Sequence, residues 1–291
     1  MAEFFLELFS EEIPAGLQKN ARENLLKLFK ENFEKKKFSY KSGVSYSTPN
    51  RLVFFFDGMS KNIQQKEIKI KGPRVDAPKQ ALEGFIKSNN LDVNDLLEES
   101  TEKGKFYFAT TKSKIIYTDN ELTKLIPEIL GKLSWKKSMK WADYELNWGR
   151  PLKSILALFN NNTLKFKFYH LESNNLTFAD SALEESKKVI NNFQSYLKLL
   201  KDKKVILDQK MRKDYIFKQI NKITKSKEIK IELNEKLLNE VNDLVERPKI
   251  ITCKFNKDFL NIPKEILIIS MQSHQKYFPT FDLNGNLTNL F

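Results

Sequence analysis

The sequence predicts an α+β fold in which mixed or antiparallel sheets pack against helices. Short apolar segments typical of strands and longer segments with apolar residues every three or four positions both occur along the chain. Asn160-Asn161-Asn162 and Asn284-Gly285 each separate two strand-like segments, as hairpin turns do. Strands and helices do not alternate one by one, so the pattern argues against a parallel α/β sheet.

The first sixty residues predict a strand, a helix and two more strands. Residues 4–9 are almost entirely apolar and read as a strand buried on both faces. Pro14 suits the first turn of a helix, and apolar residues between positions 17 and 33 lie on one helical stripe. Residues 44–47 and 51–57 are strand-like and are separated by Thr48-Pro49-Asn50.

The middle of the chain mixes both periodicities. Residues 63–71 read as a strand that Gly72-Pro73 ends, residues 78–88 as a short helix and residues 92–97 as one or two helical turns. Residues 105–111 predict a strand. Residues 119–132 predict a helix that tolerates Pro127 only with a kink or a late start. Residues 151–159 and 163–169 then form the expected hairpin.

The character of the sequence changes after Thr177. Three segments look helical (186–201, 208–225 and 234–245), and residues 204–207 and 249–254 look like strands. Residues 263–270 fit either a helix or a buried strand. We expect two domains, a mixed α+β domain over residues 1–172 and a helix-rich α+β domain over residues 173–291. Because the sequence stops inside the last strand-like segment, we expect it to be the front part of a longer polypeptide.

Composition excludes several classes of protein. Of the 291 residues, 41% are hydrophobic and 12% aromatic, enough to bury a core, so intrinsic disorder is excluded as the main state. Cys253 is the single cysteine, which excludes disulfides and Cys-based zinc sites. The longest apolar runs are much shorter than the ~18–20 residues that cross a bilayer. We therefore expect a cytoplasmic protein that has no membrane partner.

The charge balance permits RNA binding without proving it. Lys and Arg number 50 against 37 Asp and Glu, which gives a formal net charge of +13. Only six of the cationic residues are Arg, the side chain whose planar fork serves most base-specific contacts. A surplus of Lys in a chain rich in Asn, Ile and Phe more often reflects a genome with biased codon usage, although positive charge still favours contact with a polyanion.

Two segments are candidates for contact with RNA. The cations of Lys71-Gly72-Pro73-Arg74 could hold a phosphate at a turn where Gly allows close approach, although an ordinary solvated turn is the simpler interpretation. Residues 271–279 combine His274, Gln275, Lys276 and Tyr277, a set of side chains that suits recognition of nucleotides and stacking on RNA bases. The alternative interpretation is a strand edge held by structural hydrogen bonds. The sequence holds no phosphate-binding glycine motif and no Cys-His pair, and the isolated His170 reads as a packed or surface residue.

Taken in order, several blocks of the sequence resemble the β subunit family of the bacterial two-subunit glycyl-tRNA synthetase. The blocks are Phe5-Leu6-Glu7 with Ser10-Glu11-Glu12-Ile13-Pro14, Thr48-Pro49-Asn50-Arg51-Leu52, Lys71-Gly72-Pro73, Gly84-Phe85, Lys137-Ser138-Met139-Lys140-Trp141, Arg150-Pro151, residues 239–248, and His274-Gln275-Lys276-Tyr277-Phe278-Pro279. The resemblance covers essentially the whole chain. It departs from the family at Asn50. It also departs at Leu176-Thr177-Phe178-Ala179, because the family commonly has a Gly-His-Arg-Phe element in that region.

The resemblance implies a non-catalytic subunit of an α2β2 ligase. Glycine activation, with its ATP and Mg, takes place on the α subunit, so no cofactor, metal or catalytic residue is expected in this chain. The expected partners are the α subunit and tRNA(Gly), and the family's later HD-type and anticodon-binding domains lie beyond Phe291. At fold level the N-terminal part resembles the B3/B4 module of phenylalanyl-tRNA synthetase. The candidate RNA contacts are Arg51, Lys71, Arg74, Lys140, Arg150, His274, Gln275, Lys276 and Tyr277.

Two other functions stay open at this point. A hydrolytic editing module would remove the wrong amino acid from a mischarged tRNA and would need an activated water, for example near His274. Because glycine is the smallest amino acid, a site can exclude larger competitors sterically, so the need for editing is low. A plain RNA-binding or assembly scaffold is the other alternative.

Overall fold

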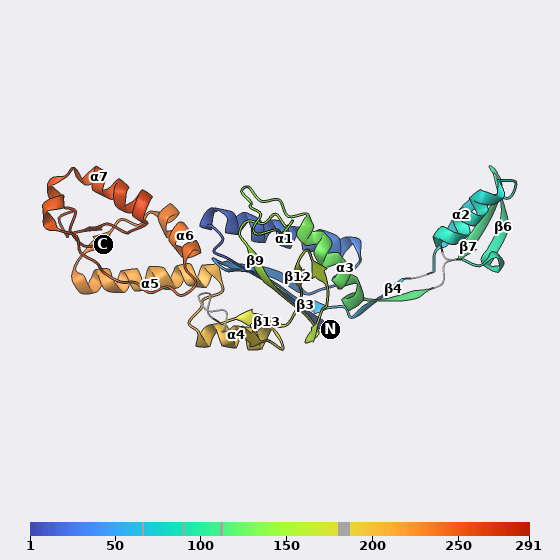
Figure 1. Cartoon of the computed structure of the whole chain (residues 1–291), viewed down its shortest axis with the longest axis horizontal. Helices are drawn as coiled ribbons and strands as arrows, with labels where there is room; N and C mark the ends of the chain where they lie inside the picture. Colours follow the sequence, from blue (N-terminus) through green and yellow to red (C-terminus); the bar gives the residue numbers. More distant parts are fainter. Residues whose placement is uncertain (66, 90, 111–112, 180–186) are drawn as a thin grey trace. The chain divides into compact units, whose positions relative to one another are not determined.

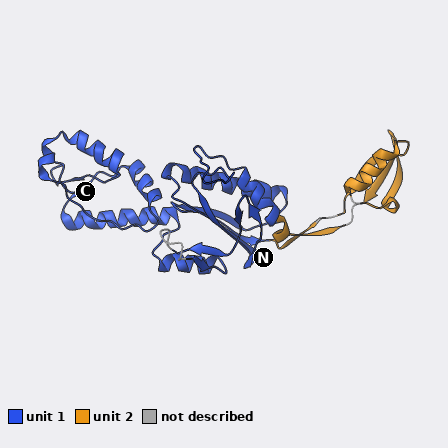
Figure 2. Cartoon of the chain, in the orientation of Figure 1, with its two compact units in different colours: residues 1–59, 122–291 blue, residues 60–121 orange. Residues whose placement is uncertain are grey.

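The computed structural model describes residues 1–65, 67–89, 91–110, 113–179 and 187–291. These residues form an α+β fold, as predicted, and divide into two compact units (Figure 2). Unit 1 comprises residues 1–59 and 122–291, and unit 2 comprises residues 60–121. Unit 2 is thus an insertion in the chain of unit 1, and the boundary expected between residues 172 and 173 lies inside unit 1.

A five-stranded antiparallel sheet is the centre of unit 1 (Figure 1). In spatial order its strands are β10 (Asn162–Thr163), β9 (Leu152–Phe159), β1 (Ala2–Ser10), β3 (Arg51–Met59) and β2 (Ser42–Thr48). The apolar run of β1 pairs with β3 on one side and with β9 on the other. β1 is therefore the middle strand, which explains why its side chains are buried on both faces.

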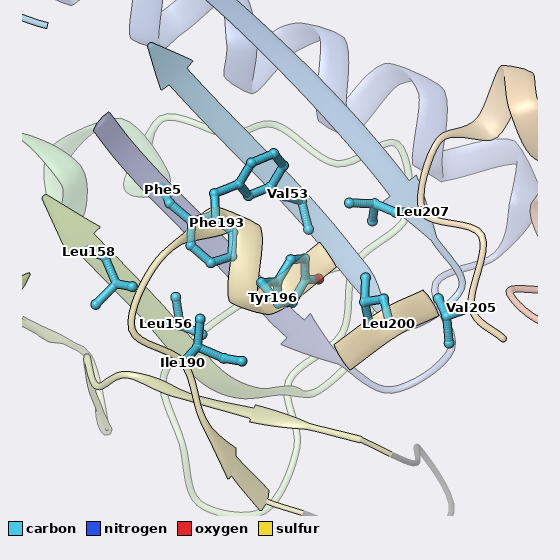
Figure 3. Close-up of a cluster of buried hydrophobic side chains, with 10 residues drawn as sticks. All are labelled: Phe5, Val53, Leu156, Leu158, Ile190, Phe193, Tyr196, Leu200, Val205 and Leu207. Atoms are coloured by element: carbon cyan, nitrogen blue, oxygen red, sulfur yellow. The ribbon is translucent and has the colours of Figure 1, made fainter. Parts of the chain in front are cut away.

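Helices cover the two faces of this sheet. Because side chains alternate along a strand, Phe4 and Phe5 point to opposite faces. Phe4 contacts the rings of Phe29 and Phe33 from α1 (Ala15–Lys35). Phe5 contacts Phe193 and Tyr196 from α4 (Phe193–Asp202), in the apolar cluster drawn in Figure 3.

The rest of unit 1 is mostly helical. Its helices are α3 (Thr118–Gly131, which begins in unit 2 and contains Pro127), α5 (Gln209–Lys227), α6 (Glu235–Leu244), α7 (Lys264–Ile269), a 3-10 turn (Lys257–Asn261) and a π-helix (Ser270–Gln275). Its short antiparallel pairs are β11 (Lys167–Phe168) with β12 (Leu171–Glu172), β13 (Leu176–Phe178) with β14 (Lys187–Val189), and β15 (Lys230–Ile231) with β16 (Thr280–Phe281). In the described chain no helix is both long and apolar enough to cross a bilayer.

Unit 2 has its own small sheet. The strands β5 (Lys69–Arg74), β7 (Gly104–Thr110) and β6 (Leu96–Thr101) lie side by side in that order, and helix α2 (Lys79–Asn89) packs against them (Figure 1). A 3-10 turn (Val93–Asp95) leads into β6. A separate ribbon of β4 (Asn62–Gln65) and β8 (Lys114–Tyr117) joins the two ends of the insertion.

The structure corrects several expected elements. Gly72-Pro73 does not end a strand but lies within β5, where the pairing with β7 shifts register between Lys71 and Arg74. Residues 204–207 and 249–254 form no ladder strands. Lys204 is a turn residue with a φ of 60°, and Lys254 forms an isolated bridge with Leu290. The first residues of the helix expected over 186–201 form β14, and residue 186 lies outside the described chain. Residues 263–270, left open between helix and strand, are helical.

Candidate nucleic-acid interface

Arg51 is not on the surface, so its assignment as an RNA contact is wrong. Its side chain is 0% exposed. One Nη donates to the Glu7 carboxylate at 3.0 Å and the other to the carbonyl of Phe178 at 2.8 Å, while Nε lies 3.3 Å from a carboxylate oxygen of Glu246. The guanidinium also lies over the ring of Phe9 at 4.8 Å. A nucleic acid cannot reach a cation that is enclosed and paired in this way.

The groups around Arg51 form a buried polar cluster. Thr177 donates to Glu7 and accepts from Arg51, and Thr48 donates to Glu246 at 2.9 Å. The hydroxyl of Tyr196 also donates to Glu7. The cluster joins β1, β2, β3, β13, α4 and the segment after α6, because each contributes one of these groups. It therefore has a structural role.

The electrostatics of the cluster hold Arg51 in its charged form. Burial opposes that charge, but the carboxylates of Glu7 and Glu246 outweigh it and raise the pKa of Arg51 above its usual value. Burial, followed by the nearby Glu7 carboxylate, raises the pKa of Tyr196 well above its usual value. Tyr196 therefore stays a neutral hydrogen-bond donor.

Lys140 belongs to an irregular segment that we call the tryptophan loop, residues 132–150. This loop contains all three tryptophans of the chain, Trp135, Trp141 and Trp148, and five cationic against two anionic residues. Met139 and Trp148 exchange backbone hydrogen bonds of 2.8 and 3.1 Å, which close residues 140–147 into a tip. The tip thus presents Lys140 and Trp141 on a stem fixed by main-chain contacts.

Aromatic rings stack at the tip. The ring of Tyr144 lies on that of His170 with centroids 3.6 Å apart and planes 7° apart, and Trp141 meets His170 edge-on at 5.7 Å. Tyr144 is 43% exposed and the neighbouring Tyr169 is 56% exposed. Partial burial lowers the pKa of His170, so its ring is neutral at pH 7. The result is a layered, partly open aromatic surface.

Exposed lysines accompany these rings. Lys136, Lys137 and Lys140 are exposed, and within the described ranges none of them forms an ion pair. Arg150 is half-buried at the end of the loop, where it donates to the carbonyl of Gly149 at 3.2 Å. Exposed ammonium groups and exposed aromatic rings carried by one segment can together bind phosphates and bases.

A cavity of about 310 Å³ is bordered by the tryptophan loop. Trp135, Trp148, Phe168 and Tyr169 are among the residues that line it. The indole N–H groups of Trp135 and Trp148 are buried and have no hydrogen-bond acceptor among the described residues. A Cβ on Gly149 would lie 2.5 Å from the Trp135 ring, so glycine is what allows the ring to pack there.

The other expected RNA contacts lie elsewhere. Lys71 and Arg74 are exposed on β5 of unit 2. His274 and Gln275 are exposed at the end of the π-helix, whereas Lys276 is paired with Glu240 at 2.9 Å and Tyr277 stacks on Phe291 at 4.5 Å. The expected contacts other than Arg51 thus lie in three parts of the chain: the tryptophan loop, β5, and the π-helix with the residues that follow it. Within the described ranges, no three His, Cys, Asp or Glu side chains are grouped as metal ligands.

Sequence reasoning missed the aromatic part of the tryptophan loop. Trp135, Tyr144 and Tyr169 were not singled out, and His170 was set aside as an isolated histidine. The available signal was the clustering of every tryptophan within residues 135–148, beside four lysines at positions 132–140. Spacing alone could not show that His170, outside the loop, stacks on Tyr144.

Comparison with known proteins gives a consistent result. A family model described as glycyl-tRNA synthetase beta subunit matches residues 4–291. The chain is 37% identical over 295 residues to the glycine–tRNA ligase beta subunit of Rickettsia peacockii (strain Rustic), and 36% identical over 291 residues to that of Rickettsia prowazekii (strain Madrid E). Each alignment covers 100% of this chain and 44% of the relative. The chain therefore spans less than half the length of these curated relatives.

Proposed function

Since the chain belongs to the glycyl-tRNA synthetase beta subunit family, we propose that it binds tRNA(Gly) through the tryptophan loop while an α subunit charges that tRNA with glycine. One observation carries the choice of surface. Lys136, Lys137 and Lys140 are exposed and form no ion pair among the described residues, and they lie in the same loop as Tyr144, whose ring stacks on His170. Lysines neutralise phosphates, and open rings accept unstacked bases.

The division of labour with the α subunit is part of the proposal. The chain supplies tRNA binding and a docking surface for the α subunit, and ATP and Mg are used on that subunit. Purified chain alone is expected to charge no tRNA with glycine. Glycylation is expected once the α subunit and the remaining β-subunit segments are present, and retention of α by immobilised chain measures assembly.

The RNA-binding test compares two sets of lysines. The triple variant Lys136→Gln, Lys137→Gln, Lys140→Gln should bind a tRNA(Gly) transcript about tenfold or more weakly at low salt, because three phosphate contacts are lost. The matched control replaces the exposed Lys198, Lys201 and Lys203 of α4 and its C-terminal end with Gln. Equal affinity for both triple variants would refute the assignment to the tryptophan loop.

A further inference from the structure

The three-stranded sheet of unit 2 has one face that the helix does not cover. Helix α2 packs on the face that carries Ile70, Gly72 and Ala109: a Cβ on Gly72 would lie 2.8 Å from the ring of Phe85, and Ala109 is buried. Side chains on the neighbouring positions of each strand point to the other face.

Cations and aromatic rings are paired on this open face. The ammonium of Lys71 lies 3.4 Å from the ring centroid of Phe106, and that of Lys69 lies 5.0 Å from the ring centroid of Phe108. The guanidinium of Arg74 is 6.0 Å from Phe106. The register shift at Gly72-Pro73 returns Arg74 to the same face as Lys71, because it pairs Arg74 with Phe106 directly.

Anions compensate two of the three cations. Lys69 is paired with Glu99, and Arg74 lies 3.2 Å from Asp76. Among the described residues Lys71 forms no ion pair, and it is exposed, so its ammonium is available to pair with an anion of a ligand. A ligand that brings both a negative charge and a flat ring would satisfy Lys71 and Phe106 together.

We propose that this open face, which we call the Phe106 face (Lys69, Lys71, Arg74, Phe106 and Phe108), binds an unpaired stretch of RNA by stacking bases on its rings. The proposal rests on the proposed function for its ligand class and adds a second binding surface. Single-stranded RNA fits because every base offers a ring face and its backbone offers phosphates for the cations. A protein partner fits less well, since charged residues are depleted at the centre of protein interfaces.

The test uses the full chain and a short single-stranded RNA of mixed sequence, with a duplex of the same sequence as comparison. Phe106→Leu with Phe108→Leu should weaken binding of the single strand about fivefold or more and leave its salt dependence unchanged, because stacking is lost but no charge is removed. Lys71→Gln with Arg74→Gln should weaken binding and reduce the salt slope by about 0.7 per lost phosphate contact.

Three further measurements control for nonspecific loss of charge and for unfolding of the variants. Lys87→Gln with Lys105→Gln removes two exposed cations of unit 2 away from the Phe106 face and should change affinity less than twofold. Glu99→Gln removes an anion without touching the rings and should raise affinity about two- to fivefold. Circular dichroism shows whether the Leu variant remains folded. If it does not, the Gln variants test RNA binding at the Phe106 face, because they change only exposed or half-exposed side chains.

The outcomes separate the two proposals. Loss of single-strand binding in the Phe106-face variants with unchanged duplex binding supports the inference. If those variants bind RNA normally while the Lys136, Lys137, Lys140 variant does not, the inference fails and the proposed function stands. If the Phe106-face variants instead bind RNA normally but no longer bind the α subunit, the face is a protein interface and the inference is overturned.

Discussion

The guanidinium Nε of Arg51 lies 3.3 Å from the carboxylate of Glu246, a residue 195 positions further along the chain. Both residues are buried, and each comes from a block of sequence that resembles the family. Glu7, from the first such block, bonds the same arginine at 3.0 Å. Three separated blocks thus meet at one ion-paired cluster, whose role is to join elements of unit 1.

Arg51→Leu should lower the free energy of unfolding by about 3–5 kcal/mol, because it leaves the carboxylates of Glu7 and Glu246 buried without their cation. Urea denaturation measures this loss. Arg150→Leu, at a half-buried arginine with no carboxylate partner among the described residues, serves as the control and should cost much less. A folded Arg51→Lys variant of unchanged stability but reduced tRNA affinity would contradict burial of this residue.

Because of Tyr196, the free energy of unfolding should fall as the pH rises into the alkaline range. Its pKa is raised in the fold, so above about pH 10 the unfolded chain releases a proton that the folded chain retains. The folded state then binds more protons, and the free energy of unfolding falls by up to about 1.4 kcal/mol per pH unit. Tyr196→Phe removes this contribution.

Urea denaturation between pH 9 and 11 compares the two proteins, with the pH values chosen to bracket the ordinary tyrosine pKa of about 10. The variant should be less stable at neutral pH, because Glu7 loses a hydrogen-bond donor, but its stability should fall less steeply as pH rises. Parallel pH curves for wild type and variant would mean that Tyr196 ionises as readily in the fold as in the unfolded chain.

Tyr144→Leu tests stacking in the tryptophan loop apart from charge. Removal of an exposed ring that stacks on His170 should weaken tRNA binding by about 1–3 kcal/mol if it carries a base. Because no phosphate contact is lost, the slope of log affinity against log salt should stay the same. Tyr215→Leu, at a 40%-exposed tyrosine on α5, is the matched control. A reduced salt slope for Tyr144→Leu would instead show that the loop had rearranged.

Gly149→Ala should displace Trp135 without altering any charge. The new methyl group would stand 2.5 Å from the indole ring, which must therefore move or tilt. We expect a cost of about 1–3 kcal/mol in stability, a changed tryptophan emission spectrum and weaker tRNA binding. Gly84→Ala, where nothing lies within 4 Å, should leave both the spectrum and tRNA binding unchanged. Normal emission from Gly149→Ala would disprove the close packing of Trp135 on Gly149.

Long periodic segments were predictable from the sequence, whereas long-range pairing was not. Helix α1 follows from apolar spacing over many turns, and the middle strand β1 follows from its continuous apolar run. Gly72-Pro73 was read as a strand end because Gly and Pro are local breakers, but pairing with β7 carries the strand through a register shift. Residues 204–207 had strand-like composition but no neighbouring strand to pair with.

The candidate site was predictable only in part, for the same reason. The family resemblance is confirmed, and Lys140 lies in the exposed loop that we assign to RNA. Arg51 was taken for a surface cation because its partners Glu7 and Glu246 lie 44 and 195 positions away, where no local pattern relates them. The stacking of His170 on Tyr144 is likewise a tertiary contact, and the sequence around neither residue indicates it.

The central claim is that tRNA(Gly) binds at the tryptophan loop, and intrinsic fluorescence tests it most directly because Trp135, Trp141 and Trp148 all lie there. Titration of the full chain with tRNA(Gly) should change tryptophan emission with the same midpoint as binding measured by filter retention. The Lys136, Lys137, Lys140 triple variant should shift both midpoints together to higher tRNA concentration. Tight binding by filter retention with no change in tryptophan emission would place the tRNA elsewhere on the chain and contradict the account.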